Sequence, residues 1–564
     1  MEKKYLITSA LPYINGVKHL GNLVGSILPA DVYAKFLRQE QKDVLFICGT
    51  DEHGTPAEIA AAEAGRPIAD YCHDMFELQK SIYEKFDIEF DHFGRSSSPA
   101  NHKITTEIFQ HLKQNGFIFE KAIHQYYSHA DGRFLPDRYV EGTCPHCGFA
   151  KARGDQCDGC GTLLEPEDLL NPYSSISGSK DIELQETRHF FLDLTKLQTK
   201  MENWIAEKKD WPDLVKGTAK KWLGEGLQAR CITRDLKWGI PVAEAGFEDK
   251  VFYVWFDAPN GYISITMDWA ESIGKPDLWK EWWMNSDNVQ YTQFMAKDNI
   301  AFHAIFWPGV LFGADMGFHQ VDYIKGFHWL NYEKGKFSTS QKRGLFTDRA
   351  IELYPADYWR YYLMTNCPET SDSDFTFAHF AAIVNKDLAD ILGNFCNRAL
   401  SLFEKYFEAT IPHQFTPADI DQDLYQKALH LTQEIESHLS HMKFRHALQS
   451  LRALWVLGNE YITEAQPWSH MKTDPEKASH ILIHCVHLMR LFAITSHSII
   501  PDSAKKILGI LNDPTAENLA HTPLQEGLNF SYFKKGHVMK PTQKLFEKVE
   551  DEAVERLTAE FSGQ

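Results

Sequence analysis

The feature that most constrains this chain is a pair of Cys-x-x-Cys turns. Cys144-Pro-His-Cys147 is followed, after nine residues, by Cys157-Asp-Gly-Cys160. Two such turns bring four thiolates into a tetrahedron, which suits zinc and closes its coordination sphere. The spacing therefore predicts one structural zinc ion per chain, held by Cys144, Cys147, Cys157 and Cys160. The alternative is four packed cysteines without a metal.

Length, composition and charge exclude several classes of protein. The chain has 564 residues, 43% hydrophobic and 24% charged, which is enough for three or four domains with buried cores. It has no run of 18 apolar residues and no signal peptide, so we expect a cytoplasmic protein without a membrane segment. The formal net charge of −19 excludes a general nucleic-acid binder, so any contact with nucleic acid must use local basic patches.

The first hundred residues alternate between strand and helix patterns. Residues 5–9 form an apolar run of strand length, and a helical pattern begins at His19 and extends to about residue 38. A second apolar run, residues 44–48, precedes another helical segment. This alternation is typical of an α/β fold with a Rossmann-like, doubly wound parallel sheet. Ligands of such sheets bind beyond the carboxyl ends of the strands, so Ala10–Asn22 and Gly49–Gly54 should share one site.

Changes in composition divide the chain into five parts. Gly, Pro, Asp and Cys become frequent after about residue 115, and long helical patterns begin near residue 357. The α/β domain is therefore expected to carry a zinc-knuckle insertion and to be followed by an all-α helical bundle. We predict the first half of the α/β domain at 1–114, the insertion at 115–225, the second half of the α/β domain at 226–355, the bundle at 356–540 and a C-terminal helix at 541–564, with its helical pattern near residues 543–560.

Two short motifs have the composition of phosphate-binding sites. His19-Leu-Gly-Asn22 lies at the expected start of the first helix, where free backbone N–H groups favour an anion. Lys336-Phe-Ser-Thr-Ser340 places cations and hydroxyls on a loop that ends at Gly344. Taken alone, the first motif is more often a helix cap and the second a solvated loop.

The order of these motifs resembles that of methionyl-tRNA synthetases, a family of class I aminoacyl-tRNA synthetases. The resemblance covers essentially the whole chain and includes Ala10-Leu-Pro-Tyr13, Cys48–Pro56, both knuckles, Tyr253–Tyr262, Lys297–Pro308 and Gln466-Pro-Trp468. It implies that ATP activates methionine to methionyl-adenylate, and that the methionyl group then passes to the 3′-terminal adenosine of methionine tRNA. It also implies that Mg²⁺ accompanies ATP.

The resemblance further implies the residues of each site. The catalytic positions are His19, Asn22, Lys336 and Thr339. The ATP-binding positions are His19, Gly21, Asn22, Lys336, Ser338, Thr339, Lys342 and Arg343. The methionine-binding positions are Ala10, Leu11, Tyr13, Asp51, Trp255, Pro259, Tyr262, Asp298, His303 and Trp307, with Asp51 pairing with the substrate ammonium. The positions that read the anticodon are Asn394, Arg398 and Trp468.

Two residues depart from the family pattern. Thr339 stands where the common loop has a second lysine, and a neutral hydroxyl cannot replace a cation, so Lys342 or Arg343 is expected to supply the charge. Asp390 stands where asparagine is common. The alternatives are a paralogue that adenylates an amino acid without tRNA, and a catalytically inactive tRNA-binding protein. No residues remain after the bundle for an OB-fold that would dimerise the chain, so we expect a monomer.

Overall fold

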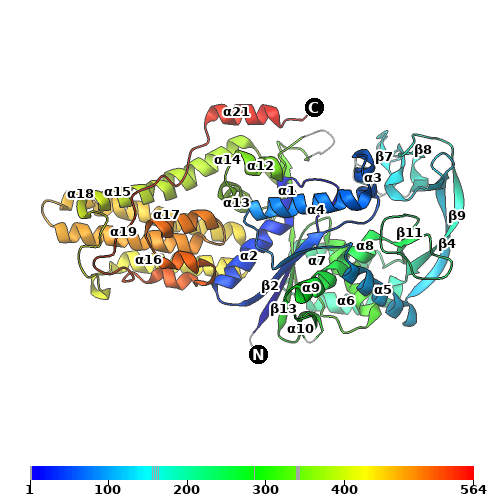
Figure 1. The fold of residues 1–564 in the computed structure, drawn as a ribbon, viewed down its shortest axis with the longest axis horizontal. Coiled ribbons are helices and arrows are strands. Elements are labelled where there is room, and N and C mark those ends of the chain that lie inside the picture. The colour runs from blue at the N-terminus through cyan, green and yellow to red at the C-terminus, as the bar shows by residue number, and fades with distance from the viewer. Residues whose placement is uncertain are drawn as a thin grey trace.

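The computed structural model describes residues 3–154, 157, 159–160, 162, 164, 166–284, 286–337 and 343–563. Ser338, Thr339 and Lys342, three of the expected nucleotide contacts, lie outside the described residues. Figure 1 shows an elongated molecule, with a helical bundle at one end, a parallel sheet in the middle and a β-rich insertion at the other end.

The central sheet has five parallel strands in the order β14-β13-β1-β2-β3. Their bounds are β1 Lys4–Ser9, β2 Asp43–Thr50, β3 His92–Arg95, β13 Val289–Ala296 and β14 Tyr323–Phe327. β1 pairs with β13 on one side and with β2 on the other, so the chain winds outward from β1 in both directions. The predicted doubly wound sheet is confirmed, and its carboxyl edge is the expected ligand site.

Both faces of the sheet are buried, which explains the continuous apolar runs of its strands. Ile7 and Phe46 pack in one hydrophobic core with the long helix Leu20–Gln39, which consists of α1 Leu20–Asn22, a π-helical stretch Leu23–Ile27 and α2 Leu28–Gln39. Leu6 and Leu45, which point to the opposite face, pack in a second core with α5 Pro99–Gln114 and α9 Gly261–Ser272. Alternate residues of each strand therefore serve different cores.

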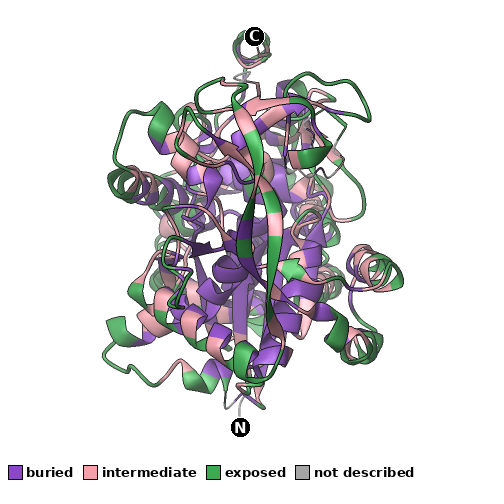
Figure 2. Ribbon diagram, turned by 90° about the vertical axis from the view of Figure 1, so that its right-hand side faces the viewer, coloured by how far each residue is buried: buried purple, intermediate pink, exposed green. Residues whose placement is uncertain are grey.

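The insertion is built on a long antiparallel ribbon. β4 Ile118–Ser128 pairs along its whole length with β9 Ile182–Leu192. Figure 2 shows this ribbon in front of the buried strands, with exposed and half-buried residues along it. A three-stranded sheet, β6 Val140–Thr143, β7 Ala152–Arg153 and β8 Leu170–Ser174, carries the first cysteine turn between its strands.

The remaining elements of the catalytic half surround the sheet and the ribbon. The helices are α3 Thr55–Glu63, α4 Ile68–Lys85, α6 Gln198–Glu207, α7 Asp213–Gly224, α8 Val254–Asp257, α10 Lys280–Trp283, α11 Trp307–Ala314 and α12 Thr347–Leu353. The strands are β5 Arg133–Phe134, β10 Arg230–Cys231, β11 Thr233–Arg234, β12 Val251–Phe252, β15 Leu330–Tyr332 and β16 Ser373–Phe375.

The C-terminal half is the expected helical bundle. Its elements are α13 Ala356–Thr365, α14 Phe377–Ile383, a π-helical stretch Val384–Gly393, α15 Asn394–Phe407, α16 Gln422–Ser440, α17 Phe444–Ala465, α18 Pro467–His470, α19 Pro475–Ser496 and α20 Pro501–Ile510. Of the described helices, α19 alone is long and apolar enough to cross a membrane, but 94% of its apolar window is buried inside the protein. It is the central helix of the bundle core, against which α15, α17 and α20 pack.

The last segment of the chain folds back along the bundle toward the sheet. The helix expected near residues 543–560 begins only at Asp551, as α21 Asp551–Glu560. Residues 541–550 are extended because other elements bind their backbone: the Asn385 side-chain amide donates to Val549 O and accepts from Val549 N–H, both at 2.8 Å. After α21, which Figure 1 shows near the C-terminus, Phe561 O accepts a hydrogen bond from Gly344 N–H at 3.1 Å. We call residues 541–563 the C-terminal strap.

A buried charge cluster fixes the bundle to the sheet domain. The fully buried Arg360 of α13 pairs with the fully buried Asp31 of α2 at 2.8 Å. Lys35, one turn after Asp31, binds the same carboxylate at 2.9 Å. The guanidinium also donates to the backbone carbonyls of Phe86, Asp87, Ser498 and Ile499. One side chain therefore satisfies acceptors from three separate parts of the chain.

Candidate active site and metal cluster

The loop after β1 ends in a reciprocal helix cap made by two predicted ATP contacts. His19 Nδ1 accepts a hydrogen bond from Asn22 N–H, and Asn22 Oδ1 accepts one from His19 N–H, both at 3.2 Å. Burial and, to a lesser extent, the Lys18 ammonium lower the pKa of His19 to about 3. The imidazole is therefore neutral, with its proton on Nε2, and it can donate this proton to a phosphate.

Gly21 is required by close packing at this helix start. A Cβ added to Gly21 would lie 3.0 Å from the His19 ring and 3.2 Å from Leu330 O. The segment after β14 thus approaches the helix start closely, and together they border the carboxyl edge of the sheet.

The described ends of the Lys336–Gly344 loop pack against this helix start. The Phe337 ring stacks on the His19 ring, with centroids 4.4 Å apart. Arg343 donates to Tyr332 O at 3.0 Å and to Glu333 O at 3.1 Å, so its guanidinium braces the loop base. Lys336 is exposed. Of the two cations that we expected to compensate for Thr339, Lys342 lies outside the described residues and Arg343 is engaged with backbone carbonyls.

The predicted methionine pocket comes together between β1, α9 and α11. The Tyr262 hydroxyl lies 2.9 Å from His303 Nε2, and the Tyr262 ring lies 5.5 Å from the Trp307 ring. Burial lowers the pKa of His303 to about 4. Because His303 Nδ1 donates to Asn299 O, Nε2 is the acceptor for Tyr262. The side chains of this group are buried.

The mouth of the pocket is aromatic as well. The Trp255 ring stacks on Phe302 with centroids 3.7 Å apart and meets Tyr13 edge-on at 6.4 Å. Leu11 lies against Gly261, where an added Cβ would be 3.2 Å from its side chain. Phe302 was missed in the sequence because a phenylalanine in an apolar run looks like any other core residue. Ala10 follows β1, and Pro259 lies in the 3-10 turn Ala258–Asn260 after α8.

Asp51 is a buried carboxylate that forms no ion pair with the described residues, although the Lys18 ammonium lies near enough to interact with it electrostatically. It is 4% exposed, follows the carboxyl end of β2, and its Oδ1 has no hydrogen-bond partner among the described residues. Burial, followed by the nearby Asp257 and Glu52 carboxylates, raises its pKa well above the usual value. A ligand ammonium at this position would supply the missing counter-charge.

Asp298 follows β13, which lies on the other side of β1 from β2 and Asp51. It is exposed, and its Oδ1 accepts a hydrogen bond from Trp329 Nε1–H at 3.4 Å. The neighbouring Lys297 pairs with Asp372 at 2.7 Å. The Lys-Asp stretch therefore faces the same carboxyl edge as Asp51.

The predicted anticodon residues lie at the far end of the bundle. Asn394 and Arg398 are one turn apart on α15, so they share a face. The Arg398 guanidinium lies 6.0 Å from the ring of Trp468, which is 41% exposed. Asp390, the acidic departure from the family pattern, pairs with Lys548 of the C-terminal strap at 2.7 Å. Its charge is therefore neutralised within the chain.

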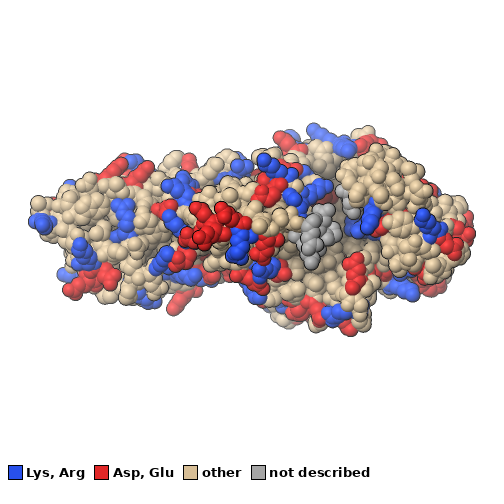
Figure 3. Space-filling model, turned by 90° about the horizontal axis from the view of Figure 1, so that it is seen from above, with Lys and Arg blue, Asp and Glu red and all other residues tan. Residues whose placement is uncertain are grey.

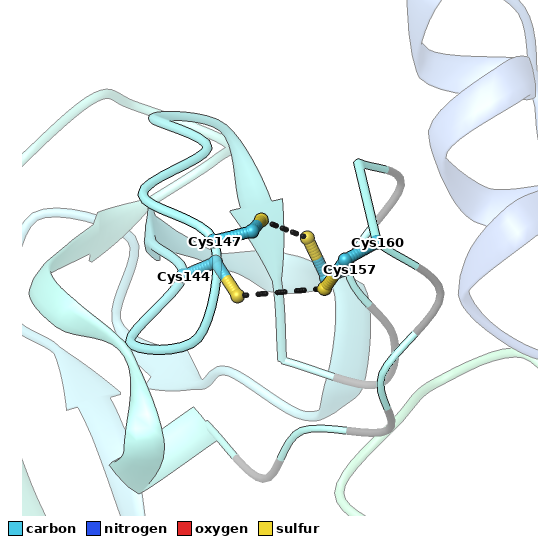
Figure 4. A group of neighbouring side chains, drawn as sticks. All are labelled: Cys144, Cys147, Cys157 and Cys160. Carbon is cyan, nitrogen blue, oxygen red and sulfur yellow. Dashed lines mark hydrogen bonds between the residues drawn. The ribbon is translucent and has the colours of Figure 1, made fainter.

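The four predicted cysteines form one cluster (Figure 4). Their sulfur atoms all lie within 4.8 Å of one another, with Cys144 to Cys160 at 3.9 Å and Cys147 to Cys157 at 3.6 Å. A tetrahedron with zinc–sulfur bonds of about 2.3 Å has sulfurs roughly 3.8 Å apart. The cluster is therefore compatible with a zinc site, and none of the described cysteines forms a disulfide.

Comparison with known proteins agrees with this geometry. The model of tRNA synthetases class I (M) matches residues 5–400, and the model of the anticodon binding domain of methionyl tRNA ligase matches residues 411–564. A doubly wound sheet with a helix start at its switch point, joined to such a domain, defines a class I aminoacyl-tRNA synthetase.

Individual relatives narrow the assignment. The chain is 50% identical over 561 residues to methionine–tRNA ligase 1 of Acaryochloris marina, with 100% of each chain covered, and 50% identical over 572 residues to methionine–tRNA ligase of Streptomyces avermitilis, with 99% of each covered. The chain belongs to the methionyl-tRNA synthetase family. A solved structure of Mycobacterium tuberculosis methionyl-tRNA synthetase in complex with methionyl-adenylate, 24% identical, shares the fold with a TM-score of 0.75 over 97% of this chain and 100% of that one.

Proposed function

We propose that this enzyme activates methionine with ATP to methionyl-adenylate and transfers the methionyl group to the 3′-terminal adenosine of methionine tRNA. The buried carboxylate of Asp51, whose Oδ1 has no hydrogen-bond partner among the described residues, lies beside an aromatic cluster and carries this proposal. It offers a counter-charge for the ammonium of an amino acid whose side chain enters the pocket. We also propose that the enzyme is a monomer and acts in the cytoplasm.

In the first step a methionine carboxylate oxygen attacks the α-phosphorus of ATP and pyrophosphate leaves. Asp51 holds the ammonium, and His19 Nε2–H at the start of α1 contacts the phosphates. The exposed Lys336 meets the negative charge that develops on the leaving pyrophosphate. Mg²⁺ bound with ATP would neutralise further phosphate charge. No protein nucleophile is needed.

Selection of methionine comes from the aromatic pocket. A thioether is polarizable and gains about 0.3–1.5 kcal/mol from each aromatic contact. The Tyr262 hydroxyl donates to His303 Nε2, so its oxygen retains lone pairs and remains a hydrogen-bond acceptor in the pocket. If an aliphatic side chain differs from methionine by one methylene, packing alone changes its binding free energy by only ~1–3 kcal/mol.

Trp468→Ala is expected to weaken use of methionine tRNA without affecting adenylate formation. Stacking of a base on an exposed aromatic ring contributes about 1–3 kcal/mol, so KM for tRNA should rise roughly 10- to 100-fold. Val538→Ala, at an apolar residue that is 52% exposed elsewhere on the bundle, serves as the control. Aminoacylation with titrated tRNA measures the effect, and an unchanged KM in Trp468→Ala would remove Trp468 from the anticodon site.

We propose that the four cysteines hold one structural zinc ion. Cys147 and Cys160 are exposed at the tips of their turns, so their double replacement by serine should abolish zinc binding without disturbing a core. Elemental analysis should find one zinc per chain in the wild type and in the control Cys231→Ser, and close to none in the double variant. A purified protein that holds iron, or no metal, would contradict the assignment.

The function is tested by methionine-dependent ATP–pyrophosphate exchange together with charging of methionine tRNA. We expect both activities. Exchange without charging would indicate the adenylating paralogue, which the neutral Thr339 keeps under consideration. Absence of exchange would indicate an inactive tRNA-binding protein.

A further inference from the structure

An exposed tryptophan borders the nucleotide side of the cleft. Trp329 follows β14 at the carboxyl edge of the sheet, is 37% exposed, and precedes Leu330, whose carbonyl approaches Gly21 of the helix start. The position of Trp329 is on the ATP side and away from the aromatic pocket that surrounds Tyr262.

The ring is held in place by its own polar groups. Trp329 N–H donates to Asp372 Oδ1 at 2.9 Å, and Ser373 N–H donates to Trp329 O at 2.9 Å. The indole Nε1–H points to Asp298 Oδ1 at 3.4 Å. Backbone and side chain are therefore both fixed, so the ring can serve as a rigid surface.

Two lysine ammonium groups lie over this ring. Lys297 Nζ is 4.1 Å and Lys336 Nζ is 5.5 Å from the ring centroid, both within the range of a cation–π interaction. Lys297 is also paired with Asp372 at 2.7 Å. For Lys336 Nζ no carboxylate or carbonyl partner is found among the described residues, so the ring is the contact that orients it.

We propose that Trp329 is a positioning residue that holds the Lys336 ammonium where the phosphates of ATP bind. The inference rests on the proposed function and deepens it, because a flexible lysine side chain gains its geometry from the ring. It has particular weight in this chain, since Thr339 leaves Lys336 as the one cation of the Lys336–Ser340 motif. Trp329 itself contacts no reacting atom in this scheme.

The test is a double-mutant cycle in ATP–pyrophosphate exchange. Trp329→Leu should lower kcat/KM for ATP about 3- to 30-fold, with KM for methionine within about twofold of wild type, whereas Trp329→Phe, which keeps a ring face, should retain most of the activity. In a Lys336→Ala background, Trp329→Leu should have little further effect, because the group that it positions is gone. Trp329→Gln, which also lacks a ring, is a second variant that tests the same prediction.

A matched control is available on the surface away from the cleft. Trp222→Leu removes another cation–π pair, formed with Arg230 at 4.9 Å, and should leave kcat/KM for ATP unchanged. If the losses from Trp329→Leu and Lys336→Ala are instead additive, the ring acts directly on the nucleotide, for example by stacking on adenine, and the proposal is wrong. It is equally wrong if Trp329→Phe is as impaired as Trp329→Leu.

Failure of this inference can be told from failure of the proposed function. If wild-type protein shows methionine-dependent exchange and Trp329→Leu matches it, only the role of Trp329 falls. If the wild type shows no exchange, the proposed function is wrong. The role of Trp329 can then be tested by calorimetry with ATP alone, in which Trp329→Leu should still bind ATP more weakly than the wild type.

Discussion

Asp51→Asn is expected to lower kcat/KM for methionine by about 10²–10³-fold in ATP–pyrophosphate exchange. Removing one partner of a buried, hydrogen-bonded charge pair costs about 2–5 kcal/mol, much of it because the other charge is left unpaired. Here that other charge is the substrate ammonium. The asparagine is nearly isosteric, so the pocket keeps its shape, and KM for ATP should change little.

The control for this variant is Asp287→Asn. Asp287 is exposed just before β13, at the amino edge of the sheet and thus opposite the site. Its replacement should leave kcat/KM for methionine unchanged. An Asp51→Asn enzyme with wild-type kcat/KM would show that the ammonium binds elsewhere, and the assignment of the pocket would have to be withdrawn.

Arg360→Met is expected to destabilise the protein by about 3–5 kcal/mol, the usual cost of removing one member of a buried ion pair. The variant removes the guanidinium partner of Asp31, which keeps only Lys35 as its cation, and leaves the buried carbonyls of Phe86, Ser498 and Ile499 without this donor. Urea unfolding followed by circular dichroism measures the loss of stability. The bundle and the sheet domain should then unfold in two separate transitions.

An exposed pair provides the comparison for Arg360. Arg66 and Asp74 lie 2.7 Å apart with side-chain exposures of 41% and 58%. Exposed pairs contribute about 0–1 kcal/mol, so Arg66→Met should be close to neutral. Equal effects of the two variants would mean that Arg360 does not join the two halves of the molecule.

The sheet could be predicted from the sequence because both of its faces are buried. The apolar runs of β1 and β2 therefore look like strands without any alternating pattern. The ribbon β4–β9 was not predicted, since most of β4 is exposed or half-buried on both faces and carries no apolar period. The helix expected at residue 543 begins eight residues later because tertiary hydrogen bonds such as that of Asn385 with Val549 hold the chain extended.

The candidate site was only partly visible in the residues themselves. The cysteine spacing was sufficient to predict a cluster, but Tyr262, His303 and Trp307 look like ordinary core residues and came from the family resemblance. Trp329 and Arg360 had no local signal at all. Their partners lie far away in the sequence, so only the folded chain shows what they contact.

Acidic side chains gather over α21 on the face that Figure 3 shows, and α21 carries Asp551 and Glu552 in its first turn. The strap that contains this helix binds Asp390 near the anticodon residues at one end and Gly344 at the other. A fluorescent dye or an affinity tag attached after Phe561 would thus sit beside the nucleotide loop. Such a label would be a poor choice for purifying unperturbed enzyme and a good choice for a biosensor of ATP occupancy.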